Sequence, residues 1–208
     1  MSVAGIAREF MARGGKRLRP RLCRAVFTHC GGMGDIEPVC EAVECFHKAS
    51  LVHDDIQDGD ETRYGRLTVW KEHGVALAIA VGDWLVARGY QLIARSGFAA
   101  APAMLVATVD SHLRLCEGQG DDLAGGADYV ATCERKTGEA FALAAQLGAL
   151  AAGADDAPFR RYGLAYGILF QINDDLADGA DPGPLLALKK RYENETAVSR
   201  DECALGVW

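Results

Sequence analysis

Helical periodicity is the feature of this sequence that most constrains its fold. Apolar or small side chains recur three or four positions apart, as in Val39, Val43, Phe46 and Ser50. Residues at that spacing lie on one face of a helix. No segment sustains the alternating pattern of a strand, and half of the residues are apolar, so one core of packed helices can be buried. The sequence therefore predicts an all-α fold, a single helical bundle.

Glycine, proline and polar clusters divide the chain into elements. They predict helices over residues 18–29, 36–57, 68–94, 99–119, 129–153 and 159–178, with a last short helix over 185–195. We expect Gly74 to interrupt the third of these, residues 58–66 to form a loop, and the glycines and prolines of 179–184 to break the chain. Because the connections are short, residues 1–208 are expected to form one domain.

Composition excludes several classes of function. A net charge of -7 lacks the basic surplus of a general nucleic-acid binder. The seven cysteines contain no Cys-x-x-Cys pair, which disfavours a disulfide framework or a zinc site and indicates the reducing cytoplasm. Residues 1–13 lack the apolar core of a secretory signal, and the apolar run 75–81 is too short to span a bilayer.

Two acidic motifs of the form Asp-Asp-x-x-Asp end two of the predicted helices. On a helix, carboxylates four residues apart lie roughly 5–6 Å apart at Cβ and repel each other, and at a C-terminus they also oppose the helix dipole. Mg²⁺ offsets that repulsion, because it takes one or two carboxylates together with substrate phosphates. The alternative, two solvated helix ends, is disfavoured because the pattern occurs twice. The predicted magnesium ligands are Asp54, Asp55, Asp58, Asp174, Asp175 and Asp178.

Basic residues that could hold phosphates lie near these motifs. Lys16 and Arg19 share one side of a predicted first helical turn, where backbone amides also favour anions. Arg63 follows the first motif, and its guanidinium can form paired hydrogen bonds with a phosphate. Lys136 lies in the middle of a predicted helix, and His47 lies two turns before the first motif. The alternatives that stay open are a solvated helix face for Lys136 and a purely structural role for His47.

The ordered set of motifs resembles the trans-isoprenyl diphosphate synthase (polyprenyl synthetase) family. The matching pieces are GKRLRP from Gly15, ECFHKASLVHDDIQD from Glu44, Gly82-Asp83, Gly118-Gln119, Lys136-Thr137 and FQINDDLAD from Phe170. Each piece alone is weak, but their order over residues 15–178 is specific. The resemblance implies an all-α bundle around a central cavity, a homodimer, and up to three Mg²⁺ ions as cofactor.

The resemblance also assigns roles to residues. Asp54, Asp58 and Asp174 would be the principal magnesium ligands, assisted by the other acidic residues of the motifs. An allylic diphosphate would be held by Arg63, Lys136, Thr137 and Gln171. Isopentenyl diphosphate would be held by Lys16, Arg19 and His47. The catalytic set would be Asp54, Asp58, Arg63, Lys136 and Asp174.

The implied reaction is a magnesium-dependent condensation of the allylic diphosphate with isopentenyl diphosphate. Ionisation would give an allylic cation, which the double bond of isopentenyl diphosphate attacks. Members of the family with bulky aromatic residues four or five positions before the first aspartate pair stop the chain early. Here those positions hold Ser50 and Ala49, which favours a trans-polyprenyl product of C20 or longer.

Some features depart from the family pattern. Tyr64 stands where an arginine is usual, no basic residue lies in 179–184, and the chain is short at both ends. Two alternatives therefore stay open. One is a class I terpene cyclase, which needs no isopentenyl diphosphate site. The other is a subunit of a heteromeric synthase that depends on a partner.

Overall fold

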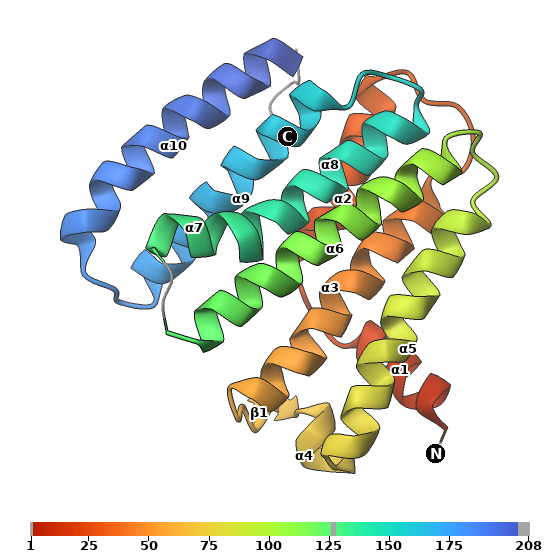
Figure 1. The fold of residues 1–208 in the computed structure, drawn as a ribbon, viewed down its shortest axis with the longest axis vertical. Coiled ribbons are helices and arrows are strands. Elements are labelled where there is room, and N and C mark those ends of the chain that lie inside the picture. The colour runs from red at the N-terminus through yellow and green to blue at the C-terminus, as the bar shows by residue number, and fades with distance from the viewer. Residues whose placement is uncertain (1, 126–127, 204–208) are drawn as a thin grey trace.

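A computed structural model describes residues 2–125 and 128–203, and it confirms the all-α fold class (Figure 1). The only regular elements in these ranges that are not helical are two short strands, β1 (Thr62–Arg63) and β2 (Arg66–Leu67), which pair antiparallel. The helices are α1 (Val3–Ala12), α2 (Leu18–His29), α3 (Glu37–Gln57), α4 (Val69–His73), α5 (Val75–Ala94), α6 (Ala101–Leu123), α7 (Tyr129–Cys133), the π-helical turn η1 (Glu134–Gly138), α8 (Glu139–Ala151), α9 (Ala157–Ala177) and α10 (Pro182–Cys203).

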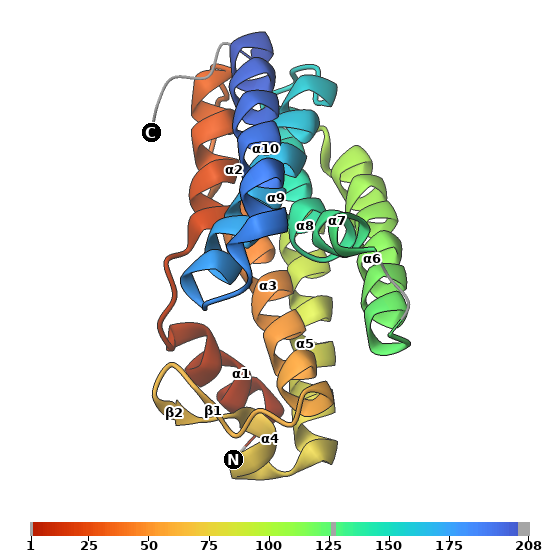
Figure 2. The same cartoon turned by 90° about the vertical axis from the view of Figure 1, so that its left-hand side faces the viewer.

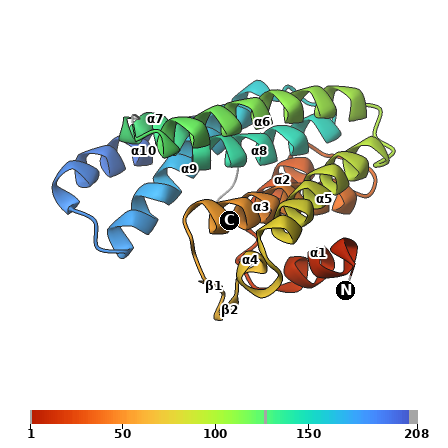
Figure 3. The ribbon, with the colours of Figure 1, turned by 60° about the horizontal axis from the view of Figure 1, so that its bottom comes forward.

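The long helices run side by side along the longest axis of the molecule (Figure 2). Among the packed pairs are α3 with α5, α8 with α9, and α9 with α10. Figure 3 shows α6 and α8 stacked over α2, α3 and α5, with α1 on the far side of that layer. α1, α4 and the β1–β2 hairpin gather at the end of the molecule where α3 finishes.

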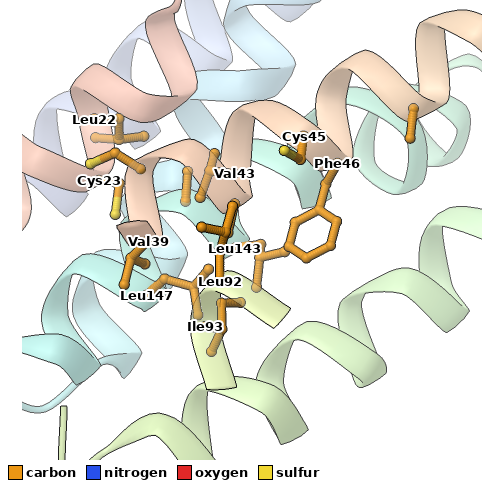
Figure 4. Packing of buried hydrophobic residues seen from close by; sticks show 14 of the residues in the cluster. Leu22, Cys23, Val39, Val43, Cys45, Phe46, Leu92, Ile93, Leu143 and Leu147 are labelled. Carbon is orange, nitrogen blue, oxygen red and sulfur yellow. The ribbon is translucent and has the colours of Figure 1, made fainter. Parts of the chain in front are cut away.

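The main core lies where α2, α3, α5 and α8 meet (Figure 4). Its buried side chains include Val39, Phe46, Ile93 and Leu147. Close approach of α8 to α2 requires glycine at position 148, since a Cβ there would lie 2.3 Å from the carbonyl oxygen of Cys23. The backbones of these helices therefore pack almost directly against each other, and this fixes the register of α8.

A second, smaller core forms between α9 and α10. Ile168 and Ile172 of α9 pack with Leu185 and Tyr192 of α10. Through this second core, α10 packs against the bundle along α9. No helix in the described ranges has both the length and the apolar character needed to cross a membrane.

Most predicted helix boundaries are close to the observed ones, and three expectations need correction. Residues 58–66 were expected to be a loop, yet they contain β1 and part of β2. The segment 129–153 is helical but is interrupted by the π-helical turn η1. The last helix is longer than expected, because α10 begins at Pro182 and runs to Cys203. Prolines in a first helical turn cost little, since amides there have no partner within the helix.

Candidate active site

The first acidic motif lies at the C-terminal end of α3, near the positive charges of Lys136 and Arg63. Burial raises the pKa of the Asp54 carboxyl, and the nearby Lys136 ammonium opposes that rise. The carboxylate of Asp58, the C-cap residue of α3, raises the pKa of Asp54 further. Lys136 belongs to η1, so η1 contributes a positive charge that acts on Asp54 at the end of α3.

Asp55 differs from its neighbour because its carboxylate is already paired. Its side chain is 1% exposed, and Oδ1 accepts a hydrogen bond from Arg63 Nε at 2.5 Å. Arg63 Nη2 also lies 3.5 Å from Asp60 Oδ2. Burial raises the pKa of Asp55 although Arg63 opposes the shift. The guanidinium of Arg63 is thus fixed beside the first motif by two carboxylates.

The second acidic motif, at the end of α9, is tied to the segment before it by a chain of hydrogen bonds. Asp175 Oδ1 accepts from Gln171 Nε2 at 2.8 Å, and Asp175 Oδ2 accepts from Tyr129 Oη at 2.6 Å. Gln171 Oε1 in turn accepts from Thr137 Oγ1 at 2.8 Å. α7, η1 and the end of α9 therefore form one polar network.

The π-helical turn η1 brings the two motifs into one network. The positive charge of Lys136 acts on Asp54 of the first motif. The next residue, Thr137, donates a hydrogen bond to Gln171, which lies beside the second motif. Lys136 Nζ also donates to Asp122 Oδ2 of α6 at 2.6 Å. A π-helical turn inserts one residue into a helix, and such turns occur frequently at functional sites. Here the turn lets consecutive side chains reach different helices.

Four of the six predicted ligands are free to bind a cation. Asp54, Asp58, Asp174 and Asp178 make no side-chain hydrogen bond or close ion pair with any residue of 2–125 or 128–203. No three acidic, histidine or cysteine side chains in those ranges form a ready-made metal cluster. Carboxylate oxygens fit Mg²⁺, which usually completes its shell with water and phosphate oxygens. The residues therefore fit Mg²⁺ bound together with a phosphate better than a cage of protein ligands alone.

Arg19 and His47, two residues predicted to bind the second diphosphate, lie together. Arg19 Nη1 is 3.5 Å from His47 Nε2, and the guanidinium stacks 4.4 Å from the centre of the Phe141 ring. Burial lowers the pKa of Arg19 to about 10. Burial and the charge of Arg19 hold the pKa of His47 well below its usual value, so this imidazole is neutral at pH 7. Lys16 is exposed in the connection between α1 and α2.

Sequence reasoning missed several polar residues around the site. Tyr129 holds Asp175, and Asp122 pairs with Lys136. Lys48 and Glu44 are both buried in α3. Tyr129 lies seven residues before Lys136, two helical turns away, which is a signal that could have suggested a shared face. Lys48 stands out as a charged residue within a mostly apolar stretch.

A groove of about 490 Å³ lies elsewhere, between η1, α9 and α10. Its lining includes Arg161, Leu164, Ile168, Tyr192 and Val198, and none of the predicted site residues. Both arginines at its edge are already paired, Arg161 with Glu202 and Arg191 with Glu195. The groove is therefore separate from the acidic motifs.

The all-helical bundle, with two acidic helix ends connected through η1, belongs to the isoprenoid synthase class of folds. Residues 2–183 match the family model for polyprenyl synthetase, and the chain belongs to that family.

The chain is similar to several characterised relatives. It is 39% identical over 182 residues to a geranylgeranyl diphosphate synthase from Mycobacterium tuberculosis, and this alignment covers 81% of this chain and 52% of the relative. A crystal structure of geranylgeranyl pyrophosphate synthetase from the archaeon Geoglobus acetivorans aligns with a TM-score of 0.77 and 32% identity, covering 83% of this chain and 60% of that one. A polyprenyl synthase from Caulobacter crescentus, complexed with calcium and isoprenyl diphosphate, aligns with a TM-score of 0.76 and 32% identity, covering 83% and 55%.

The chain spans between 52% and 61% of the length of the curated relatives it matches. The matched residues end at 183, so nearly all of α10 lies beyond the family match.

Proposed function

We propose that this chain is a magnesium-dependent trans-prenyltransferase that condenses an allylic diphosphate with isopentenyl diphosphate. One observation carries the proposal. Lys136 acts electrostatically on Asp54, while the adjacent Thr137 bonds Gln171, which holds Asp175. Two acidic motifs 120 positions apart, from Asp54 to Asp174, therefore share one network of polar side chains. Family membership and the names of the relatives support the same reaction.

The six aspartates divide into two groups in this proposal. Asp54, Asp58, Asp174 and Asp178 are the ligands, because no hydrogen bond or close ion pair with a described residue holds their side chains. Asp55 and Asp175 instead orient the motifs, because Arg63 holds the first and Gln171 with Tyr129 holds the second. Bound Mg²⁺ would supply positive charge to the leaving diphosphate. The calcium and isoprenyl diphosphate bound to the Caulobacter crescentus relative support such a site.

The basic side chains hold the two diphosphates. Lys136 and Arg63 lie beside the first motif and, with Thr137 and Gln171, bind the allylic diphosphate. Their charges stabilise the leaving group as the C–O bond breaks. Lys136 exchanges its present partner, Asp122, for a phosphate oxygen.

Arg19, His47 and Lys16 bind the diphosphate of isopentenyl diphosphate. Because His47 is neutral at pH 7, it contributes a hydrogen bond, and the positive charge at this subsite comes from Arg19 and Lys16. No side-chain nucleophile takes part, since the attacking group is the double bond of the second substrate.

We further propose a product of C20 or longer. Ala49 is buried and Ser50 is exposed on α3, and neither side chain is large enough to stop a growing chain. Two relatives, from Mycobacterium tuberculosis and Geoglobus acetivorans, are named as geranylgeranyl diphosphate synthases. A product assay with primers of increasing length measures both the preferred primer and the final product length.

The test is a product assay with labelled isopentenyl diphosphate, Mg²⁺ and allylic primers of increasing length. Condensation predicts labelled products that require both substrates and disappear when EDTA removes the metal. A terpene cyclase predicts hydrocarbon from the allylic substrate alone. If no product forms under any of these conditions, both activities are contradicted. The remaining alternative is then the partner-dependent subunit.

We also propose a homodimer, formed through the outer faces of α5 and α6. Large apolar side chains are exposed there, including Ile79 of α5 and Val106, Val109 and Leu113 of α6. Such a patch on a globular surface marks an interaction site. A cytoplasmic location stays a prediction from the cysteine pattern; the seven thiols are free in the structure.

A further inference from the structure

Lys48 is a buried lysine in α3 for which the proposed reaction has no use. Its side chain is 0% exposed, and Nζ donates to the carbonyl oxygens of Arg13 at 2.6 Å and Gly14 at 3.0 Å. These two carbonyls begin the connection between α1 and α2, residues 13–17, which we call the basic turn. The basic turn carries Lys16 and leads directly to Arg19 on α2.

Two aromatic rings complete the surroundings of the Lys48 ammonium. Its Nζ lies 4.4 Å from the centre of the Tyr64 ring and 5.3 Å from that of Phe10. Cations bind favourably over aromatic faces, most strongly where water is excluded. Tyr64 also packs on the basic turn itself, since a Cβ on Gly14 would lie 3.2 Å from Tyr64 Cγ. The turn is therefore held by hydrogen bonds from Lys48 and covered by the ring of Tyr64.

The backbone of the basic turn needs such support. Gly14, Gly15 and Arg17 have φ angles of 28°, 106° and 50°, and a positive φ at a residue with a side chain is uncommon. Conformations of this kind persist only where surrounding contacts determine them. Of the side chains around the turn, Lys48 supplies the hydrogen bonds to its backbone carbonyls.

Burying this ammonium is costly, which indicates a specific role. Burial lowers the pKa of Lys48, and the charge of Glu44, itself buried, opposes the shift. A buried charge destabilises a fold unless charged or hydrogen-bonding partners compensate. Here every partner of Lys48 belongs to the basic turn, to a ring that covers it or to the adjoining turn of α3.

We propose that Lys48, covered by Tyr64, is a positioning residue that fixes the basic turn so that Lys16 and Arg19 meet the diphosphate of isopentenyl diphosphate. The proposal rests on the proposed function for the identity of that ligand. It also gives a role to Tyr64, which stands at a position where the family usually has arginine. In this chain Tyr64 contributes an aromatic face for the Lys48 ammonium, and it adds no positive charge to the subsite.

The first experiment measures order in the basic turn without reference to activity. The full chain and the Lys48→Met variant are digested briefly with trypsin, and cleavage within residues 13–17 is followed by mass spectrometry. We expect several-fold faster cleavage in Lys48→Met and in Tyr64→Leu, and the wild-type rate in Tyr64→Phe, which keeps the ring. Lys71→Met is the matched control, because Lys71 is an exposed lysine paired with Glu61.

The second experiment measures the anion site. We expect Lys48→Met to weaken binding of inorganic pyrophosphate, measured by calorimetry without Mg²⁺, by about tenfold. The KM for isopentenyl diphosphate should rise similarly, while kcat and the KM for the allylic substrate stay at the values of Lys71→Met. Lys48→Arg, which keeps a charged donor, should restore part of the affinity.

Wild-type cleavage rates and pyrophosphate affinity in Lys48→Met would overturn the proposal, as would an equal rise in both KM values. If Lys48→Met does not fold, judged by circular dichroism, Tyr64→Leu decides by the same measurements. Lack of condensing activity in the wild-type chain would count against the proposed function alone. The trypsin and pyrophosphate results would then still decide the role of Lys48.

Discussion

At the scale of single residues, the free carboxylates of the two motifs should carry the activity. Asp54 is partly buried beside Asp58, and neither side chain makes a hydrogen bond with a described residue. We expect Asp54→Asn to lower kcat/KM by about 100-fold or more, because removing one metal ligand removes charge stabilisation of the leaving group. Steady-state kinetics at saturating Mg²⁺ measure the effect.

The matched control is Asp201→Asn, since Asp201 is an exposed aspartate of α10 that forms a weak pair with Arg200 at 3.6 Å. Its kcat/KM should equal that of the wild type. Equal activities of Asp54→Asn and Asp201→Asn would remove Asp54 from the metal site.

Tyr129 should matter through Asp175. Its hydroxyl donates to Asp175 Oδ2 at 2.6 Å, so Tyr129→Phe frees one oxygen of a carboxylate that otherwise orients the second motif. We expect kcat to fall about tenfold, the usual scale for losing one hydrogen bond to a charged group, with little change in thermal stability. Tyr192→Phe, on α10, is the control, and an equal loss in both variants would contradict a role for Tyr129.

His112 should make stability depend on pH. It is half-buried against Phe46 and Tyr90, and this partial burial lowers its pKa from 6.5 to about 4. The folded chain thus keeps the imidazole neutral, and this contribution to stability is present above pH 6.5 and is lost as the pH falls toward 4.

The variant His112→Gln removes that titration. Its free energy of unfolding should fall less than that of the wild type between pH 6.5 and 4, by up to about 3 kcal/mol. Urea unfolding at several pH values measures the difference, and parallel curves would show that His112 does not titrate abnormally.

At the scale of elements, the register of α8 against α2 depends on Gly148. A Cβ at this position would lie 2.3 Å from the Cys23 carbonyl oxygen and 3.1 Å from Val26 Cβ. Because neither backbone nor a β-branched side chain yields easily, Gly148→Ala should destabilise the fold by about 1–3 kcal/mol.

Gly120 of α6 provides the matched control, since nothing lies within 4 Å of a Cβ placed there. Gly120→Ala should be neutral or stabilise by about 0.5–1 kcal/mol, as alanine favours helix. Thermal unfolding of the two variants makes the comparison, and equal stability would contradict the close approach of α8 to α2.

The elements also show where sequence reasoning succeeds. The boundaries of α2 were predicted at Leu18 and His29 and are found there, and the break at Gly74 has the positive φ of 85° that favours glycine. These are local signals. The length of α10 was underestimated, because its packing on Ile168 and Ile172 of α9 is a tertiary effect that local periodicity does not contain.

At the scale of the whole molecule, the apolar surface of α5 and α6 predicts self-association. Leu113 of α6 is 59% exposed within that surface, and Leu186 of α10 is 55% exposed outside it. We expect Leu113→Glu to shift the chain from dimer to monomer, whereas Leu186→Glu should not. Light scattering after size-exclusion chromatography measures the masses, and a monomeric wild type would refute the proposed dimer.

The organisation of residues 1–208 as one domain stays a prediction. The family match covers residues 2–183 and does not test the domain boundaries. The alignment with the Mycobacterium tuberculosis relative covers 52% of that protein. A product assay on the chain as it stands remains the direct measure of activity.

The sequence by itself determined the all-α class, most helix boundaries and the two acidic motifs. These depend on residue types at spacings of one to four, and interactions between near neighbours act before any tertiary contact forms. It also carried the resemblance to the polyprenyl synthetase family, which the family match confirms.

Only the tertiary structure decided which of these polar residues are free and which are held. Asp174 and Asp175 are neighbours in sequence, yet only Asp175 accepts a hydrogen bond from the hydroxyl of Tyr129, 46 positions before it. Lys48 belongs to a helix that the sequence predicts, but its hydrogen bonds go to carbonyls 34 and 35 positions away. Such contacts depend on how helices pack, and packing is set by the whole core and not by the local pattern.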